Sequence, residues 1–461
     1  MSRQKIGVFI IKADYIPSWF QPGVLDKLAE KFSVTVFVPN QLLSLVETYR
    51  LRIPDVNIGI ARIESPKSTY VSDVYSFLLM LSLRKRSKSI KFRLRRMLLG
   101  ELLLFPYPLS MKKTIHSFVF NLKSFIRYFL NPNHIIFLRV FIPLPILLKI
   151  FQELFNKSTC DISNLIHFKL DWAIFPSGAN DIYTYRLMRE FNSLNIKTFL
   201  CLENWDNLTS KSFIITKPNF IAVMGNECKV LASSVQNIDS ETVIVLGLPR
   251  FNPYRFHQNF MAKDLDTFLG RPVKVIYLGC SMPHNEINLL NSLLRCIDIE
   301  NLKWQFELIY KPHPARRPRF YEDTNLDSRV KLAESGNKFA VPIIDKGHMN
   351  QILDADIVIS APTTMMIEAM ILNKKVIVDV SDDNIHRTTA GKAIKRYDHF
   401  NSILTNKDLL FCKTSREMLL GIMDYLENTH YVEYDLENLI ENSSTDYGSK
   451  LVEVISNKSL S

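Results

Sequence analysis

Short apolar runs alternate with stretches whose apolar residues recur every three or four positions along most of this chain. Such runs are typical of buried strands, and such stretches of amphipathic helices. The first series of strand-like runs covers residues 6–11, 34–38, 172–175, 198–202, 220–224 and 242–246. The second series covers residues 273–278, 306–310, 357–359 and 376–380. Helix-like stretches include residues 23–31, 183–194, 287–296 and 364–372. This alternation predicts an α/β protein with parallel, doubly wound sheets.

A polar break divides the two series of strand-like runs. It covers residues 247–264 and contains Pro249 and Pro253, which are typical of an interdomain linker. We therefore expect one Rossmann-like domain over residues 1–250 and a second over 251–425. Residues 426–461 are expected to form a helical tail that packs back on the first domain. Because ligands of such sheets bind at the carboxyl ends of the strands, the two domains should face each other across a cleft.

The distribution of charge singles out one segment. The 461 residues include 57 Lys and Arg against 46 Asp and Glu, a formal net charge of +11. Residues 74–150 hold 14 of these bases and a single acid, Glu101, so the segment carries +13 and the rest of the chain −2. A nucleic-acid-binding protein that is basic throughout is therefore disfavoured. We interpret residues 74–150 as a basic, mostly helical insert in the first domain.

The insert has the composition of a segment that lies on a membrane surface. Eight bases are concentrated in residues 84–96, namely Arg84, Lys85, Arg86, Lys88, Lys91, Arg93, Arg95 and Arg96. In a helix, Ile90, Leu94, Met97 and Leu98 would fall on one face beside them. A basic face next to an apolar face suits an anionic leaflet. The alternatives are a solvated insert, an oligomer contact or a polyanion such as RNA; we expect the membrane and no nucleic acid.

The sequence also bears on the compartment. Residues 6–11 are interpreted as a first strand and not as a signal peptide, since no small-residue cleavage site follows them. The six cysteines are scattered without a CxxC pair, which fits a reduced cytosolic protein without a cysteine-based zinc site. The uncharged stretches of residues 97–150 fall short of the roughly 18–20 residues needed to span a bilayer. We expect a cytoplasmic protein peripherally associated with the inner face of the plasma membrane.

Two motifs in the second half could bind phosphate, although the chain has no glycine-rich phosphate loop. In residues 355–378, a strand, a polar turn and a helix follow one another, and Pro362 suits the first helical turn. Ser360, Thr363 and Thr364 would place hydroxyls and backbone N–H groups where a diphosphate could sit, and Glu368 could accept from ribose hydroxyls. The alternative is ordinary helix capping.

The second of these motifs follows the strand-like run 306–310. Lys311, His313, Arg316 and Arg317 form a compact cationic group suited to phosphate oxygens, and two prolines restrict the backbone around His313. The alternative is a solvated basic turn.

Candidate acceptor groups lie in the first half, after strand-like runs. Residues 202–211 place Glu203 and Asp206 near Trp205, Asn207 and Lys211. A Trp ring can carry a sugar face, and a carboxylate can deprotonate an attacking hydroxyl. Asp181 follows another strand, as a helix cap or a substrate contact, and residues 12–14 could also face the cleft. The alternative for the loop is an Asx turn.

These motifs together resemble glycosyltransferases of the GT-B architecture that act in bacterial surface-polysaccharide synthesis. The chain is also distantly similar to CDP-glycerol glycerophosphotransferases. Their Trp-His-Gly-x-x-x-Lys loop is similar to residues 205–211, and their Gly-x-Pro-Arg turn to residues 247–250. Their Lys-x-His-Pro motif is similar to residues 311–314, and their Ser-Ser helix start to residues 361–368. The match covers about residues 170–380. It departs where those enzymes have the His of their loop, which is Asp206 here.

The resemblance implies a metal-independent, inverting glycosyltransferase of capsule or lipopolysaccharide synthesis, with no cofactor. The second domain would bind a nucleotide-sugar: Lys311, His313 and Arg316 would meet the diphosphate together with the helix start at Thr363 and Thr364, and Glu368 would meet the ribose or sugar. Asp206 would be the general base, with Glu203 in reserve, on a lipid-linked glycan acceptor. The acceptor contacts would be Trp205, Asn207, Lys211 and Asp181. A CDP-alcohol-dependent polyol-phosphate transferase, a sugar-nucleotide 2-epimerase and a non-catalytic membrane scaffold are the alternatives.

Overall fold

The computed structural model describes most of the chain. The described residues are 3–53, 57–64, 70–84, 86–98, 143–157, 160–178, 181–211, 213–255, 270–282, 284–300, 302–313, 325–333, 346–386, 389–427, 432, 434–441 and 444–459. Within these ranges the side chains of residues 70–73, 76, 95–98, 211, 255 and 346–348 are not described. Lys85, Arg316 and the greater part of the basic insert, residues 99–142, lie outside the described residues.

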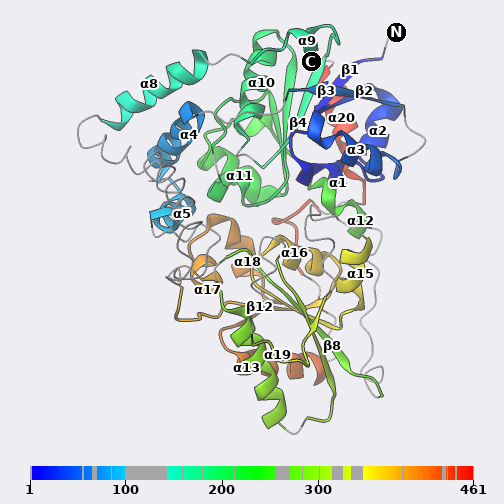
Figure 1. The fold of residues 1–461 in the computed structure, drawn as a ribbon, viewed down its shortest axis with the longest axis vertical. Coiled ribbons are helices and arrows are strands. Elements are labelled where there is room, and N and C mark those ends of the chain that lie inside the picture. Colours follow the sequence, from blue (N-terminus) through cyan, green and yellow to red (C-terminus); the bar gives the residue numbers. More distant parts are fainter. Residues whose placement is uncertain are drawn as a thin grey trace, which may run out of the picture.

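The first domain is built on a parallel sheet of seven strands (Figure 1). The strands are β1 (Lys5–Phe9), β2 (Ser33–Pro39), β3 (Ile58–Ile63), β4 (Trp172–Ser177), β5 (Lys197–Leu202), β6 (Phe220–Val223) and β7 (Val243–Val245). Their order is β3-β2-β1-β4-β5-β6-β7, so the direction of winding reverses between β1 and β4. The helices of this domain are α1 (Ile16–Trp19), α2 (Leu25–Lys31), α3 (Leu43–Arg50), α4 (Tyr70–Leu83), α5 (Lys88–Leu98), α8 (Leu144–Lys157), α9 (Ser163–Ile166), α10 (Ile182–Ser193) and α11 (Asn226–Ser234).

The second domain is built on a parallel sheet of six strands. The strands are β8 (Val273–Leu278), β9 (Phe306–Lys311), β10 (Lys331–Leu332), β11 (Ile357–Ser360), β12 (Lys375–Asp379) and β13 (Leu410–Cys412), in the order β10-β9-β8-β11-β12-β13. The helices are α13 (Glu286–Ile299), α15 (Lys346–Asp354), α16 (Thr364–Ile371), α17 (Ala390–Ala393), α18 (Asn401–Thr405) and α19 (Ser415–Glu427). Two doubly wound α/β domains are thus confirmed, and the winding of the second sheet reverses between β8 and β11.

Short helical turns join these elements. They are η1 (Ala13–Tyr15), η2 (Asn40–Leu42), η3 (Asn207–Lys211), η4 (Ser240–Thr242), η5 (Pro249–Phe251) and η7 (Asp398–Phe400), and α12 (Asn252–Arg255) follows η5 directly. The turn η5 and helix α12 lie where the chain passes from the first domain to the second (Figure 1).

The chain returns to the first domain through its last helix, α20 (Tyr447–Ser459). Tyr447, Leu451 and Ile455 follow one another at intervals of four residues and are all buried. They join the apolar core on the α1 and α2 side of the first sheet, where the rings of Tyr447 and Trp19 meet edge to face at 6.1 Å. Because one stripe of this helix is apolar, burial against that sheet stabilises its helical form.

Helix α5 of the basic insert packs between the two domains. Ile90 and Leu94, which the sequence placed on a lipid-facing side, are buried in the protein core, and that expectation for the helix is corrected. Arg93, expected to face a membrane, donates instead to the backbone carbonyl of Ser210. Phe92 meets the ring of Tyr397 at 5.2 Å. The apolar face of α5 therefore has a protein partner, which a reading of the helix alone does not reveal.

The start of α5 is tied to the second domain by hydrogen bonds. The Asp398 carboxylate accepts from the Ser87 hydroxyl at 2.5 Å and from the Ser89 hydroxyl at 3.0 Å. The backbone N–H of Asp398 donates in return to the Ser89 hydroxyl at 2.6 Å. In the part of the chain that the structure describes, no helix is long and apolar enough to cross a membrane.

Candidate functional site

Glu203 follows β5 and turns its carboxyl group into the first domain. Trp19 Nε1 donates to Oε1 at 2.7 Å, and the Ser18 hydroxyl donates to Oε2 at 3.2 Å. Burial raises the pKa of Glu203 to about 7, against the lowering effect of these two hydrogen bonds and of the Arg250 charge. A carboxyl group with this pKa is present in both protonation states near neutrality, which suits proton transfer.

Asp181 lies beside the point where the winding of the first sheet reverses. Its Oδ2 accepts from the Tyr15 hydroxyl at 2.7 Å and from the Ser177 hydroxyl at 2.9 Å, and its Oδ1 pairs with Lys12. Asp181 precedes α10 but makes no side-chain cap to it. The structure thus brings polar groups from the ends of β1 and β4 together at the position where sheets of this kind bind ligands.

Arg250 and Glu368 connect the two domains. Arg250 belongs to η5, and its Nη2 donates to Glu368 Oε1 at 2.5 Å; Tyr254 of α12 donates to Oε2 at 3.0 Å. The Glu368 side chain is 0% exposed and the Arg250 side chain 23% exposed. The carboxylate therefore lies in the domain junction with both oxygens occupied. In this arrangement it is not open to a ribose.

The charges of this pair also act on one group in each domain. Arg250 is close enough to Glu203 for its charge to lower the pKa of that carboxyl group, although burial dominates. On the other side, burial lowers the pKa of Lys311 while the charge of Glu368 opposes the change. The charge of Arg250 thus acts on Glu203 after β5, and the charge of Glu368 acts on Lys311 at the end of β9.

The start of α16 lies at the winding reversal of the second sheet. Thr363 precedes the helix with an extended backbone, and its side chain makes no capping hydrogen bond. The Ser360 hydroxyl donates to the Ala361 carbonyl at 2.8 Å and lies 3.3 Å from the Thr363 hydroxyl. The Thr363 side chain therefore does not cap α16. The N–H groups of a first helical turn and the helix dipole attract anions.

The end of β9 places Lys311 and His313 beside the end of β8. Lys311 is half-buried and its ammonium donates to Gln351 Oε1 of α15. Gly279 follows β8, and its N–H donates to the Lys311 carbonyl at 2.8 Å. A Cβ atom on Gly279 would lie 3.1 Å from His313 N and 2.7 Å from Glu286 Oε2. The two strand ends are packed too closely for a side chain at this position. Arg316, expected in the same group, lies outside the described residues.

The loop after Glu203 makes contacts with the second domain. Trp205 is buried, and its ring meets those of His399 and Phe400 at 5.1 Å each. The Thr209 hydroxyl lies 2.7 Å from His399 Nδ1. Trp205, expected to carry a sugar face, therefore has its ring covered by the second domain.

Other side chains of this loop bond within the loop. Asn207 is buried and its Oδ1 accepts from Asn204 N at 2.8 Å. Asp206 is half-buried, and its Oδ2 accepts from the Ser210 hydroxyl at 3.2 Å. The Lys211 backbone belongs to η3, and its side chain is not described. The hydrogen bonds of Asn207 and Asp206 hold the shape of the loop.

Several residues of the site were missing from the sequence prediction. Trp19, Tyr15 and Tyr254 reach Glu203, Asp181 and Glu368 from segments without a recognisable motif. Arg250 had a signal, since it closes the Gly-x-Pro-Arg turn, but the turn was noted only as a resemblance. Its partner lies 118 residues further along the chain.

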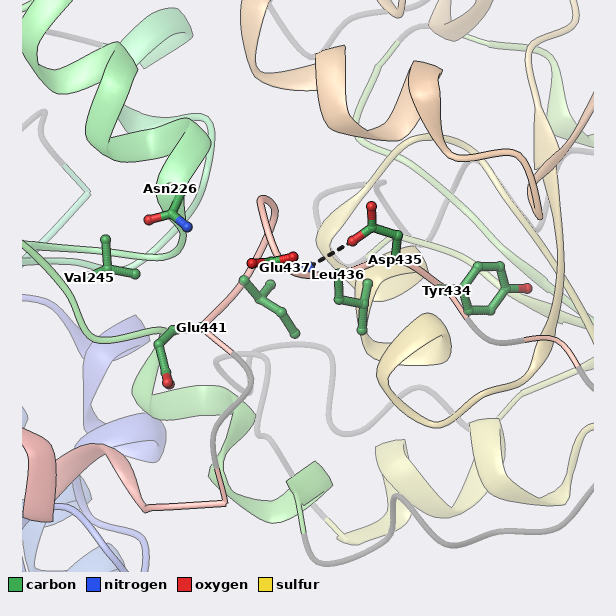
Figure 2. Close-up of a pocket in the computed structure, with 8 residues that line it drawn as sticks. Asn226, Val245, Tyr434, Asp435, Leu436, Glu437 and Glu441 are labelled. Carbon is green, nitrogen blue, oxygen red and sulfur yellow. Dashed lines mark hydrogen bonds between the residues drawn. The ribbon is translucent and has the colours of Figure 1, made fainter.

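A separate pocket of about 440 Å³ lies between the first domain and the segment 434–441 (Figure 2). Asn226 and Val245 line one side, and Asp435, Glu437 and Glu441 belong to the segment on the other. Three carboxyl groups in one pocket disfavour a diphosphate, because like charges repel. None of the residues discussed above lines this pocket.

Comparisons with known proteins place the fold. No protein-family model matches the sequence, and no curated protein matches it. A Listeria monocytogenes structure assigned as a UDP-N-acetylglucosamine 2-epimerase is 11% identical, with a TM-score of 0.51, over 99% of this chain and 97% of that chain. UDP-GlcNAc 2-epimerase from Neisseria meningitidis is 12% identical, with a TM-score of 0.49, over 99% and 100%.

A glycosyltransferase from Rickettsia africae is 12% identical, with a TM-score of 0.45, over 100% of this chain and 94% of that chain. At these identities only the fold is comparable. The likeness to the Listeria structure extends over both domains, and the two parallel sheets described above have a GT-B-like arrangement.

Proposed function

We propose that this protein is a glycosyltransferase that transfers a sugar from a nucleotide-activated donor to a lipid-linked surface-polysaccharide acceptor, without a metal ion. The observation that carries the proposal is the start of α16. It lies at the winding reversal of the second sheet, the Thr363 side chain does not cap it, and Lys311 lies near Glu368 of the same helix. A nucleoside diphosphate is the ligand class that such a positively polarised helix start and a neighbouring ammonium suit best.

In this proposal the donor diphosphate lies against the first turn of α16, with Ser360, Thr363 and Thr364 around it. Lys311 and His313 approach from the end of β9, and Arg316 is expected to join them. Their positive charge stabilises the nucleoside diphosphate as it departs. Glu368 was expected at the ribose; its buried bond to Arg250 favours a different role, in which it fixes the donor helix to the domain junction.

We assign the general base to Glu203 before Asp206, and this role requires the hydrogen bonds from Trp19 and Ser18 to its carboxyl group to open when the acceptor binds. Glu203 lies near Arg250, which contacts the donor helix, and its pKa of about 7 allows it to accept a proton at neutral pH. Glu203 would take the proton of the acceptor hydroxyl while the new bond forms at the anomeric carbon and the bond to the diphosphate breaks. Asp181 and Lys12 would contact the acceptor.

A sugar-nucleotide 2-epimerase is the second candidate, and a specific observation favours it. Glu203 and Asp181 are buried carboxyl groups after neighbouring strands, and Asp181 raises the pKa of Glu203. Such a pair is also suited to removing a proton from a sugar carbon and returning it. Both candidates bind a nucleotide-sugar at the same place, and they differ in whether a sugar C–H bond is broken.

The first experiment is a thermal-shift panel with CMP, CDP, UDP, GDP and their sugars. We expect at least one nucleoside diphosphate to raise the melting temperature, and Lys311→Gln to weaken its binding. Lys331→Gln is the matched control, since Lys331 lies on the neighbouring strand and its charge is exposed to solvent. If no nucleotide changes the melting temperature, the result favours a non-catalytic scaffold. If only CDP-alcohols raise the melting temperature, it favours a polyol-phosphate transferase.

The second experiment separates transfer from epimerisation. The nucleotide-sugar that binds is incubated with the protein in deuterium oxide without an acceptor. A 2-epimerase incorporates deuterium at carbon 2 of the sugar, whereas the proposed transferase leaves that position protonated. Deuterium incorporation would therefore overturn the transferase in favour of the epimerase.

The proposal also includes a location. We place the enzyme in the cytoplasm, held at the inner face of the plasma membrane by its basic insert, where a lipid-linked acceptor is within reach. Exposed bases of the described part of the insert, among them Arg86, Lys88 and Lys91, support this view. An anionic surface attracts each such base with about 1 kcal/mol.

A further inference from the structure

Helix α8 exposes a continuous apolar stripe. Ile146, Ile150 and Leu154 are 52%, 43% and 43% exposed and lie four residues apart, so they occupy one side of the helix. The helix packs on α4 through a different side, on which Leu147 and Phe155 are buried. The other large exposed apolar residues of the described chain occur singly, each on a separate element. A stripe of neighbouring exposed apolar side chains is unusual on a protein surface, whereas single exposed apolar side chains are normal.

The surroundings of the stripe are basic. Helices α8, α4 and α5 lie together along one edge of the molecule (Figure 1). Arg86, Lys88 and Lys91 are exposed on this edge, and Lys149 is exposed on α8 next to Ile150. Helix α8 has one acidic residue, Glu153, against two bases, Lys149 and Lys157. The chain between α5 and α8, residues 99–142, adds five bases and one acid to the same insert.

This arrangement reassigns the membrane contact within the insert. The apolar face of α5 is buried against the protein, so α5 can offer charge but little apolar surface. Helix α8 offers apolar surface with exposed Lys149 and Lys157 on the same helix, and the bases of α5 lie further along the same edge (Figure 1). An apolar stripe next to bases is the combination by which a helix lies in the headgroup region of an anionic bilayer.

We propose that α8 is the helix through which this protein enters an anionic membrane surface, with Ile146, Ile150 and Leu154 among the upper acyl chains. Arg86, Lys88, Lys91 and Lys149 meet the lipid headgroups. The proposal rests on the proposed function for its purpose, since a transferase with a lipid-linked acceptor works at a membrane. It can be tested without any nucleotide or sugar.

The first test locates the helix by fluorescence quenching. The protein carries Ile150→Trp or, as a control on another side of the same helix, Gln152→Trp. Vesicles contain phosphatidylglycerol and phosphatidylcholine, with or without brominated acyl chains. The four native tryptophans are buried, so brominated lipid should leave their emission unchanged. We expect strong quenching at position 150 and much weaker quenching at position 152.

The second test measures binding by vesicle flotation. The variant Ile146→Ser/Ile150→Ser/Leu154→Ser should bind phosphatidylglycerol vesicles at least about tenfold more weakly, because three branched apolar side chains no longer leave water. The matched control, Val230→Ser/Ile299→Ser/Leu420→Ser, removes three exposed apolar side chains from elements outside the insert and should bind within about twofold of the parent. Vesicles of phosphatidylcholine alone should bind both variants only weakly.

Other occupants of the stripe would give different results. If residues 99–142 or a second copy covers α8, the tryptophan at position 150 emits from an apolar environment without vesicles and brominated lipid does not quench it. A second copy would also dissociate when the three serines are introduced. Either outcome overturns the proposal. The nucleotide thermal shift of the same triple variant should stay unchanged, so membrane docking and the proposed function can fail independently.

Discussion

Replacing Arg250 by Gln tests whether the domain junction depends on a buried ion pair. The change removes the Arg250 cation from the Glu368 carboxylate, which is 0% exposed, while the described hydrogen bond from Tyr254 remains. Breaking a buried pair in this way costs about 3–5 kcal/mol. Because Arg250 is 23% exposed and the charges of Lys311 and Glu368 interact, we expect a cost somewhat below this range, about 2–3 kcal/mol. In domains of this size, that lowers the melting temperature by about 5–10 °C.

The assay is thermal unfolding followed by tryptophan fluorescence, with a surface pair as the control. Arg329 bonds Asp298 at 2.7 Å, but these side chains are 51% and 48% exposed. Arg329→Gln should change stability by less than about 1 kcal/mol, since water replaces the lost bond. Glu368→Gln together with Arg250→Gln should cost less than Arg250→Gln alone, because no buried charge is then left unpaired. Equal melting temperatures for Arg250→Gln and Arg329→Gln would refute the reasoning.

Two further substitutions test the site. Glu203→Gln should lower transfer by about 10²–10⁴-fold if Glu203 is the base. Burial raises the pKa of Glu203 in the folded protein to about 7, so the wild type loses stability as pH rises from the ordinary pKa of Glu through 7. Glu203→Gln should remove this loss. Unfolding followed from pH 4 to 8 measures the slope of stability against pH. An unchanged slope would contradict the burial argument. Gly279→Ala should destabilise the protein by about 1–3 kcal/mol, since its Cβ would lie 2.7 Å from Glu286 Oε2, and should weaken nucleotide binding by displacing Lys311 and His313. A wild-type melting temperature would mean that this contact relaxes freely.

The central strands and the edge strand β7 could be predicted from sequence, but the edge strands β3, β10 and β13 could not. The run 273–278 coincides with β8, because a strand covered on both faces is apolar throughout. Strand β3 (Ile58–Ile63) lies at the edge of the first sheet, and only its first and last residues are buried. Its polar and small residues therefore gave no apolar run. Strand β13 is also an edge strand, in the second sheet, and is only three residues long.

The positions of the candidate residues could be predicted better than their surroundings. Sequence placed Glu203 after a strand and Thr363 before a helix, and both lie there. It could not show that Trp19 covers Glu203, since the two are 184 residues apart. It could not separate Glu203 from Asp206 as a base, because the burial that raises the pKa of Glu203 depends on contacts with distant segments. Contacts between distant segments also decided that the apolar face of α5 is buried.

The central claim is that a nucleoside diphosphate binds at the start of α16. Hydrogen–deuterium exchange with and without the nucleoside diphosphate that raises the melting temperature tests this most directly. Protection of the backbone N–H groups of residues 363–367, and of residues 311–313 beside them, is the predicted result. A nucleotide that binds but leaves these amides unprotected, and protects another region instead, would contradict the account.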